Sequence, residues 1–258
     1  MRRAALTVAT LLLASAAAHA DPEIDRTWRA GRVYADEAGS IVSGPIGETA
    51  ARLTGAFAGR RLPTVIYMHG CSGIDGYSEQ TVEVYARAGF LVLLPDSFAR
   101  LDKPASCDVA RHLGGLHRAA LAWRQAEATN AIWQARRLPF VDPRNLFLAG
   151  LSEGAITAAT IRRARVNARI VEGWTCHAAW SEYAGLAAGA PVLAFSSQDD
   201  PWFQQDWARG DCGAFMNARD GSRSIVFRAP DSLHDQHFVF WRADVRATAL
   251  SFLRAHMR

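Results

Sequence analysis

Ser152 lies at the centre of the sequence GLSEG, residues 150–154, between a short apolar run and a stretch of helical character. A serine on such a tight strand-to-helix turn is exposed at the edge of a sheet, and the start of the following helix favours developing negative charge beside it. The two glycines let the neighbouring strand and helix approach closely. This spacing predicts that Ser152 is a nucleophile; a purely structural turn is the alternative.

A second candidate segment is HGCSG, residues 69–73, directly after the apolar run 64–68. A His-Gly pair after this strand is where α/β-hydrolases place the second donor of their oxyanion hole. We therefore expect the backbone N–H groups of Glu153 and Cys71 to bind the oxyanion, with His69 organising the loop. The alternative is that Cys71 itself is a nucleophile beside His69.

An acid and a base must follow later strands if the chain order is Ser, Asp, His. Residues 199 and 200, an Asp-Asp pair, follow the apolar run 191–195, and two histidines follow the run 225–227. We predict that Asp200 orients the imidazole of His234, which acts as the base. Asp199 and His237 are the alternatives, and an Asp-Pro pair can also simply begin a helix.

These residues need a sheet to position them, and the chain alternates between short apolar runs and helical stretches. Continuous apolar runs between turn residues are typical of buried parallel strands. The predicted strands span 64–68, 90–94, 146–149, 170–171, 191–195 and 225–227, and the predicted helices about 78–88, 108–137, 155–164 and 244–256. Residues 21–60 are expected to form an outer strand or hairpin. The unbroken rhythm predicts one α/β domain over residues 21–258.

The first 20 residues have the pattern of a removable secretory signal peptide. Arg2 and Arg3 precede an apolar run rich in Ala and Leu, and Ala18-His19-Ala20 provides small residues before a cleavage point. The run is too short for a stable membrane anchor. We expect an exported protein, periplasmic or secreted.

Export changes the interpretation of the four cysteines. In an oxidising compartment an even count suggests two disulfides, for which three connectivities exist. The sequence separations predict Cys71 with Cys107 and Cys176 with Cys212, 36 residues apart in each case. Four unpaired thiols are the alternative.

The overall composition excludes several classes of protein. Half of the 258 residues are hydrophobic and 21% are charged, which argues against disorder, collagen and coiled coil. Removing Arg2 and Arg3 with the leader leaves 27 basic against 25 acidic residues, with no basic run, so no nucleic-acid partner is expected. No metal-ligand cluster or phosphate-binding glycine loop is apparent, so neither a metal nor a cofactor is expected. The oligomeric state is left open.

Four segments together resemble the dienelactone hydrolase family of the α/β-hydrolase superfamily, and the resemblance extends from about residue 60 to the end. The segments are GLSEG at 150–154, YMHGCSG at 67–73, LPDSFAR at 94–100 and DDPW at 199–202. The resemblance implies a mostly parallel central sheet with helices on both faces, no large cap domain, and an open site acting on an ester or lactone. The enzymes that give the family its name have a cysteine at the position of Ser152. This departure points to a general serine esterase.

The predicted function is hydrolysis of a small-molecule carboxylic ester or lactone through an acyl-enzyme. A peptidase or thioesterase on the same fold, or a non-catalytic exported binding protein, are the alternatives. Candidates to stack an aromatic or sugar substrate are four tryptophans of the second half, Trp174, Trp180, Trp202 and Trp207, and Arg100 is a candidate to bind a carboxylate. Structural roles are the alternative: packing in the core or against a disulfide for the tryptophans, and an ion pair for Arg100.

Overall fold

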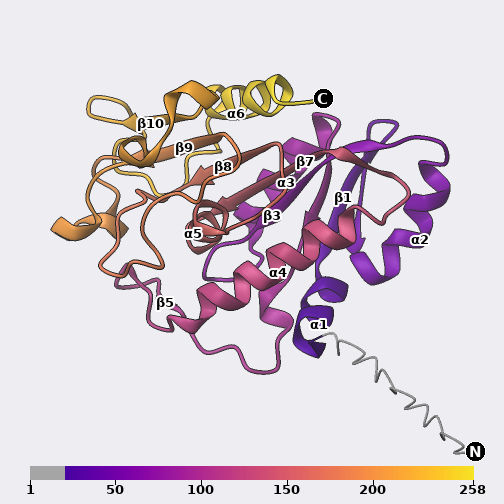
Figure 1. The fold of residues 1–258 in the computed structure, drawn as a ribbon, viewed down its shortest axis with the longest axis horizontal. Coiled ribbons are helices and arrows are strands. Elements are labelled where there is room, and N and C mark those ends of the chain that lie inside the picture. The colour runs from indigo at the N-terminus through magenta and orange to yellow at the C-terminus, as the bar shows by residue number, and fades with distance from the viewer. Residues whose placement is uncertain (1–20) are drawn as a thin grey trace, which may run out of the picture.

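The computed structural model describes residues 21–258, and the predicted leader, residues 1–20, lies outside the described residues. Its main strands are β1 (Arg32–Glu37), β2 (Ser40–Pro45), β3 (Leu62–Met68), β4 (Leu91–Leu94), β7 (Val141–Leu151), β8 (Ala168–Glu172), β9 (Val192–Ser197) and β10 (Arg223–Phe227). They form one sheet in the order β10-β9-β8-β7-β3-β4-β1-β2 (Figure 1). Neighbours run parallel from β10 to β4, whereas β1 is antiparallel to both β4 and β2.

Six α-helices cover the sheet. They are α1 (Pro22–Ala30), α2 (Ile46–Ala56), α3 (Gly76–Arg87), α4 (Ala119–Ala135), α5 (Glu153–Thr160) and α6 (Ala243–Ala255). Buried side chains of α1, α2, α4 and α5 belong to one hydrophobic core, and those of α3 and α6 to a second. In Figure 1, α4 and α5 cross the face of the sheet turned toward the viewer. The predicted α/β-hydrolase architecture, with helices on both faces, is confirmed.

The two cores follow from the alternation of side chains along each strand. On β7, Leu146 and Leu148 face the core beneath α4 and α5, whereas Phe147 and Ala149 face the core beneath α3 and α6. All four are at most 1% exposed, so this central strand is apolar on both faces. That burial explains the continuous apolar run in the sequence.

Local signals also define the helix that follows the loop after β3. The Asp75 carboxylate accepts the Ser78 N–H at 2.8 Å and caps α3. The helix stops before Gly89, whose φ of +92° is a left-handed conformation that suits glycine. The predicted helix 78–88 is therefore present, shifted by two residues at its start.

The helix predicted over residues 108–137 begins later than predicted. Residues 107–114 form a small antiparallel hairpin, β5 (Cys107–Asp108) and β6 (Leu113–Gly114), where the sequence predicted helix, and the helix begins only at α4. His112 at its turn has a φ of +53°, which a helix does not allow. Residues 21–60 hold the expected hairpin, β1 and β2, together with helices α1 and α2.

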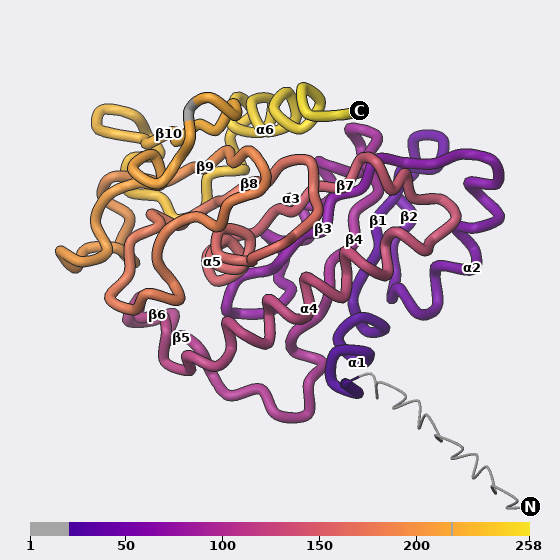
Figure 2. Tube along the Cα trace, viewed as in Figure 1, coloured from indigo at the N-terminus to yellow at the C-terminus, as the bar shows by residue number. Residues whose placement is uncertain are grey.

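The parallel strands direct their carboxyl ends to one edge of the sheet. The segments after β3, β7, β8, β9 and β10 therefore meet there, which is where open α/β sheets place ligand sites. Figure 2 shows the β5–β6 hairpin beside the segments that follow β8 and β9. No large cap domain is present within residues 21–258.

Candidate active site

Ser152 occupies a strained turn between β7 and α5. Its φ of +55° and ψ of −118° place a non-glycine residue in a region that L-residues rarely adopt. A Cβ on Gly150 would lie 2.2 Å from the Gly154 oxygen, and one on Gly154 would lie 2.0 Å from the Met68 oxygen. Both positions therefore exclude any larger residue, as the GLSEG spacing predicted.

Ser152 lines a cavity at the start of the helix that follows it. Its side chain does not cap α5, although Ser152 occupies the N-cap position. Glu153 and Cys71 line the same cavity as Ser152. Their backbone N–H groups, one of them at the first residue of α5, remain the candidates for the oxyanion hole.

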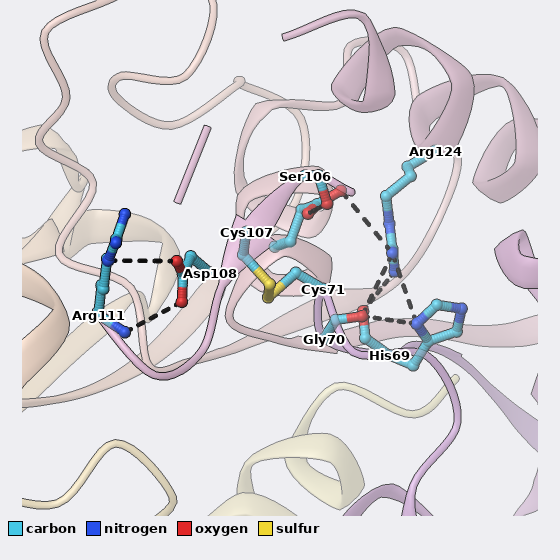
Figure 3. Close-up of a disulfide and its surroundings, with 9 residues drawn as sticks. His69, Gly70, Cys71, Ser106, Cys107, Asp108, Arg111 and Arg124 are labelled. Carbon is cyan, nitrogen blue, oxygen red and sulfur yellow. Dashed lines mark hydrogen bonds and ion pairs between the residues drawn. A yellow bond between two sulfur atoms is a disulfide. The ribbon is translucent and has the colours of Figure 1, made fainter. Parts of the chain in front are cut away.

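His69 is locked inside the loop that carries Cys71. The Ser97 N–H donates to its Nε2 at 3.2 Å, and its Nδ1 donates to the Gly70 carbonyl at 2.7 Å. Complete burial and the nearby Arg124 guanidinium hold the pKa of His69 well below its usual range. Figure 3 shows Arg124 reaching both His69 and the Gly70 carbonyl. A neutral, buried imidazole with both nitrogens engaged supports the loop and is not available as a base.

Both predicted disulfides are confirmed. Cys71–Cys107 joins the loop after β3 to the β5–β6 hairpin, and Cys176–Cys212 joins the segments after β8 and β9 (Figure 3 shows the first). Each bridge spans 36 residues of sequence. Because its sulfur is bonded to Cys107, Cys71 is not a free thiol nucleophile.

Two carboxylate–imidazole pairs follow β9 and β10, and they differ from the predicted pairing. Nδ1 of His237 lies 2.7 Å from Oδ2 of Asp200, and both side chains are buried. Nδ1 of His234 lies 3.1 Å from Oδ2 of Asp199, and this pair is half-exposed. The predicted combination of Asp200 with His234 is not formed. The structure brings Asp200 together with the alternative base instead.

The Asp200–His237 pair is held rigidly. The second oxygen of Asp200 accepts the Trp202 N–H at 3.0 Å, at the start of the short 3-10 helix Pro201–Phe203. The Trp202 ring stacks on the His237 ring, with centroids 5.3 Å apart. Nε2 of His237 is buried and has no hydrogen-bond partner among the described residues. One ring nitrogen is therefore fixed by a carboxylate and the other is free to take a proton.

Backbone contacts place His237 next to the serine turn. The Ser152 N–H donates to the Glu172 carbonyl at 2.8 Å. The next residue, Gly173, has a φ of +65°, and a Cβ there would lie 3.1 Å from Cε1 of His237. Hence the His237 ring packs directly on the turn at Glu172 and Gly173, to which the Ser152 backbone is hydrogen-bonded.

Glu172 is a functional candidate that the sequence analysis missed. Its carboxylate accepts the Val239 N–H at 2.9 Å, the Phe240 N–H at 3.2 Å and the Tyr77 hydroxyl. Burial raises the pKa of this carboxyl group. A glutamate at the end of an apolar strand was the available signal. It anchors the backbone two and three residues beyond His237.

The cavity beside Ser152 has an aromatic lining. Trp174 and Trp202 line it, as the sequence analysis anticipated for substrate-binding residues. Trp180 and Trp207, which the sequence analysis also named, line it as well, and so do two aromatic residues that it did not name, Tyr183 and Phe203. The β5–β6 hairpin adds Cys107 and Gly114 to the wall.

Arg100 lies outside this cavity. Its Nε is 2.6 Å from the Glu127 carboxylate, and the side chain is 8% exposed. Its guanidinium also lies 5.2 Å from the centroid of the Trp123 ring. Arg100 is thus engaged in a buried ion pair and is not positioned to bind a carboxylate beside Ser152.

No group of three or more His, Cys, Asp or Glu side chains within residues 21–258 is arranged to hold a metal ion. No helix in that same part of the chain has the length and apolarity needed to cross a bilayer.

No protein-family model and no curated protein matches this chain. Solved structures resemble it at low identity. A putative dienelactone hydrolase from Klebsiella pneumoniae has a TM-score of 0.56 and 13% identity, over 87% of this chain and 98% of that one. A dienelactone hydrolase-like promiscuous phosphotriesterase from metagenomic libraries has a TM-score of 0.52 and 16% identity, over 88% and 98%.

A third solved structure belongs to a longer protein. The acylaminoacyl peptidase of Pyrococcus horikoshii has a TM-score of 0.50 and 16% identity, over 78% of this chain and 38% of that one. At these identities the likenesses show the fold, which is that of the α/β-hydrolases.

Proposed function

We propose that this protein is a serine hydrolase that cleaves carboxylic esters or lactones through an acyl-enzyme, as a member of the dienelactone hydrolase family. The observation that carries the proposal is the buried Asp200–His237 pair. This pair packs on the Gly173 turn, and the preceding residue, Glu172, accepts a hydrogen bond from the Ser152 N–H. A nucleophile, an orienting acid and a base, in this chain order, are the parts of a serine triad.

In the proposed reaction Ser152 attacks the acyl carbonyl while Nε2 of His237 takes the hydroxyl proton. The Asp200 carboxylate accepts a hydrogen bond from the Nδ1–H group of His237. This bond fixes the imidazole and stabilises its charged form. The N–H groups of Glu153 and Cys71 stabilise the oxyanion. His237 then protonates the leaving alcohol, and a water that His237 activates releases the acid. His234 takes no part in this sequence.

The protein is further proposed to work outside the cytoplasm, in the periplasm or after secretion. Two disulfides support this location, because such bonds persist mainly in oxidising compartments. The leader-like sequence of residues 1–20 supports it independently.

Replacing the proposed nucleophile tests the reaction class. In hydrolysis of p-nitrophenyl acetate we expect Ser152→Ala to lower kcat by at least about 10³-fold, because the covalent step is lost. The variant should keep the wild-type circular dichroism and melting temperature. A wild-type kcat in Ser152→Ala would refute the proposal, and absence of all turnover in the wild type would favour a binding protein. Peptide and thioester substrates, assayed in parallel, separate the alternative hydrolase classes.

A further inference from the structure

The larger side chains that line the Ser152 cavity are mostly aromatic, and few polar side chains lie among them. Trp180 is the centre of this wall: its ring lies 5.7 Å from that of Tyr183 and 6.4 Å from that of Trp207, between centroids. A Cβ on Gly115 would lie 2.5 Å from the Trp180 ring, so the chain leaving β6 packs directly on it. The hairpin and the segment after β8 thus enclose an aromatic surface facing the serine.

The acidic side chain that lines this cavity already has polar partners. Among the described residues, Glu153 is the one acidic or basic residue of the lining. Its carboxylate accepts the Ser106 hydroxyl and lies 3.9 Å from the Arg124 guanidinium, with the arginine itself 3% exposed. A carboxylate on the substrate would therefore meet no free cation and would stay desolvated without a partner.

The same lining offers little to a sugar. The Tyr183 hydroxyl donates to the Arg118 carbonyl at 3.2 Å, and Glu153 is engaged as described. The hydroxyl groups of a sugar would lose water and find few hydrogen-bond partners here, at a cost for each buried group. The Trp174 Nε1 is a buried donor without a partner among the described residues, but most of the lining is made of ring faces and edges. Such a lining instead suits a flat apolar group.

We propose that this cavity binds an uncharged aromatic ring of the ester substrate, and that Trp180 determines this specificity. The inference rests on the proposed function of Ser152. It distinguishes aromatic esters from both sugar esters and esters that carry a carboxylate. The ring can belong to the acyl or the alcohol part, because both parts are attached to the carbonyl carbon that Ser152 attacks.

The test compares kcat/KM for benzyl acetate and its isomer methyl phenylacetate with that for ethyl acetate. Monomethyl succinate and a monoacetylated hexose are the charged and sugar arms. We expect at least one aromatic isomer to exceed ethyl acetate by about tenfold, the scale of one buried ring contact, and both other arms to fall below it. Trp180→Ala should reduce the ratio of kcat/KM for the aromatic ester to kcat/KM for ethyl acetate to about one, whereas Trp180→Phe should retain most of this ratio.

Trp133→Ala is the matched control, because Trp133 is an exposed tryptophan on α4 that does not line the cavity. It should leave every ratio unchanged. Equal rates for aromatic and aliphatic esters, preference for the succinate or sugar arm, or a preference that survives Trp180→Ala would overturn the inference. When one of these outcomes occurs while the wild type hydrolyses ethyl acetate and Ser152→Ala does not, only this inference has failed. If Ser152→Ala hydrolyses ethyl acetate normally, the proposed function has failed as well.

Discussion

At the scale of single residues, the segment carrying His237 depends on one buried carboxylate. Glu172 is 1% exposed and accepts the N–H groups of Val239 and Phe240. The histidine it stabilises must keep a fixed ring position to transfer protons efficiently. Glu172 is therefore a positioning residue, acting through the backbone beyond His237.

Glu172→Ala is expected to lower kcat by about 10- to 100-fold with little change in KM, because it loosens the base without touching the substrate. Leaving buried N–H groups unpaired should also cost about 1–3 kcal/mol in the free energy of unfolding. Glu172→Gln keeps an acceptor oxygen and should recover part of kcat. Steady-state kinetics and urea unfolding check this, with the exposed Glu48→Gln as control. A wild-type kcat in Glu172→Ala would contradict the role.

The base could not be identified from sequence for a physical reason. His234 and His237 both follow β10, and Asp199 and Asp200 are adjacent, so sequence distance allows either combination. The difference lies in burial: the Asp200–His237 pair is covered by Trp202 and the Gly173 turn, whereas the other pair faces solvent. Those contacts are long-range. The tight turn at Ser152, by contrast, was predictable because its glycines and flanking elements are local.

At the scale of elements, the strands were predictable and the hairpin was not. Runs such as Leu146–Ala149 are apolar because both faces of the sheet are covered, a pattern visible without any tertiary information. The β5–β6 hairpin comprises only two residues per strand and is tied to the loop after β3 by Cys71–Cys107. A distant covalent link, rather than local periodicity, accounts for its placement.

The two disulfides should therefore differ in their effect on activity. Replacing Cys71 and Cys107 together by Ser should cost about 4 kcal/mol of stability on the chain-entropy account, and so should the Cys176/Cys212 double variant, since both loops span 36 residues. The variant that lacks Cys71 and Cys107 should lower kcat more, because the backbone N–H of residue 71 is a proposed oxyanion donor. Denaturant unfolding and esterase kinetics of both variants check this. Equal kcat values would contradict the assigned role of Cys71.

At the scale of the whole molecule, every one of the five tyrosines has a raised pKa. Burial raises the pKa of Tyr34 and of Tyr183 to about 12, and it also raises the pKa values of Tyr67, Tyr77 and Tyr85 well above the ordinary tyrosine value. The charged phenolate is thus disfavoured in the folded state. The corresponding stability is fully present below pH 10, the unfolded value, and is lost as pH rises through the folded values.

We expect the folded protein to show almost no tyrosinate absorbance near pH 11, and all five tyrosines to ionise together when alkali unfolds the chain. Parallel circular dichroism should place both changes at the same pH. Tyrosinate that appears with a midpoint near pH 10 while the fold persists would contradict the burial of these side chains.

The central claim, that Ser152 and His237 act together, is tested most directly by the rate of covalent labelling with a fluorophosphonate. Peptide mass spectrometry should locate the adduct on Ser152 in the wild type. His234→Ala should label at the wild-type rate, whereas His237→Ala should label at least about 10²-fold more slowly, since the general base is lost. An adduct at another residue, or slow labelling in His234→Ala with normal labelling in His237→Ala, would contradict the account.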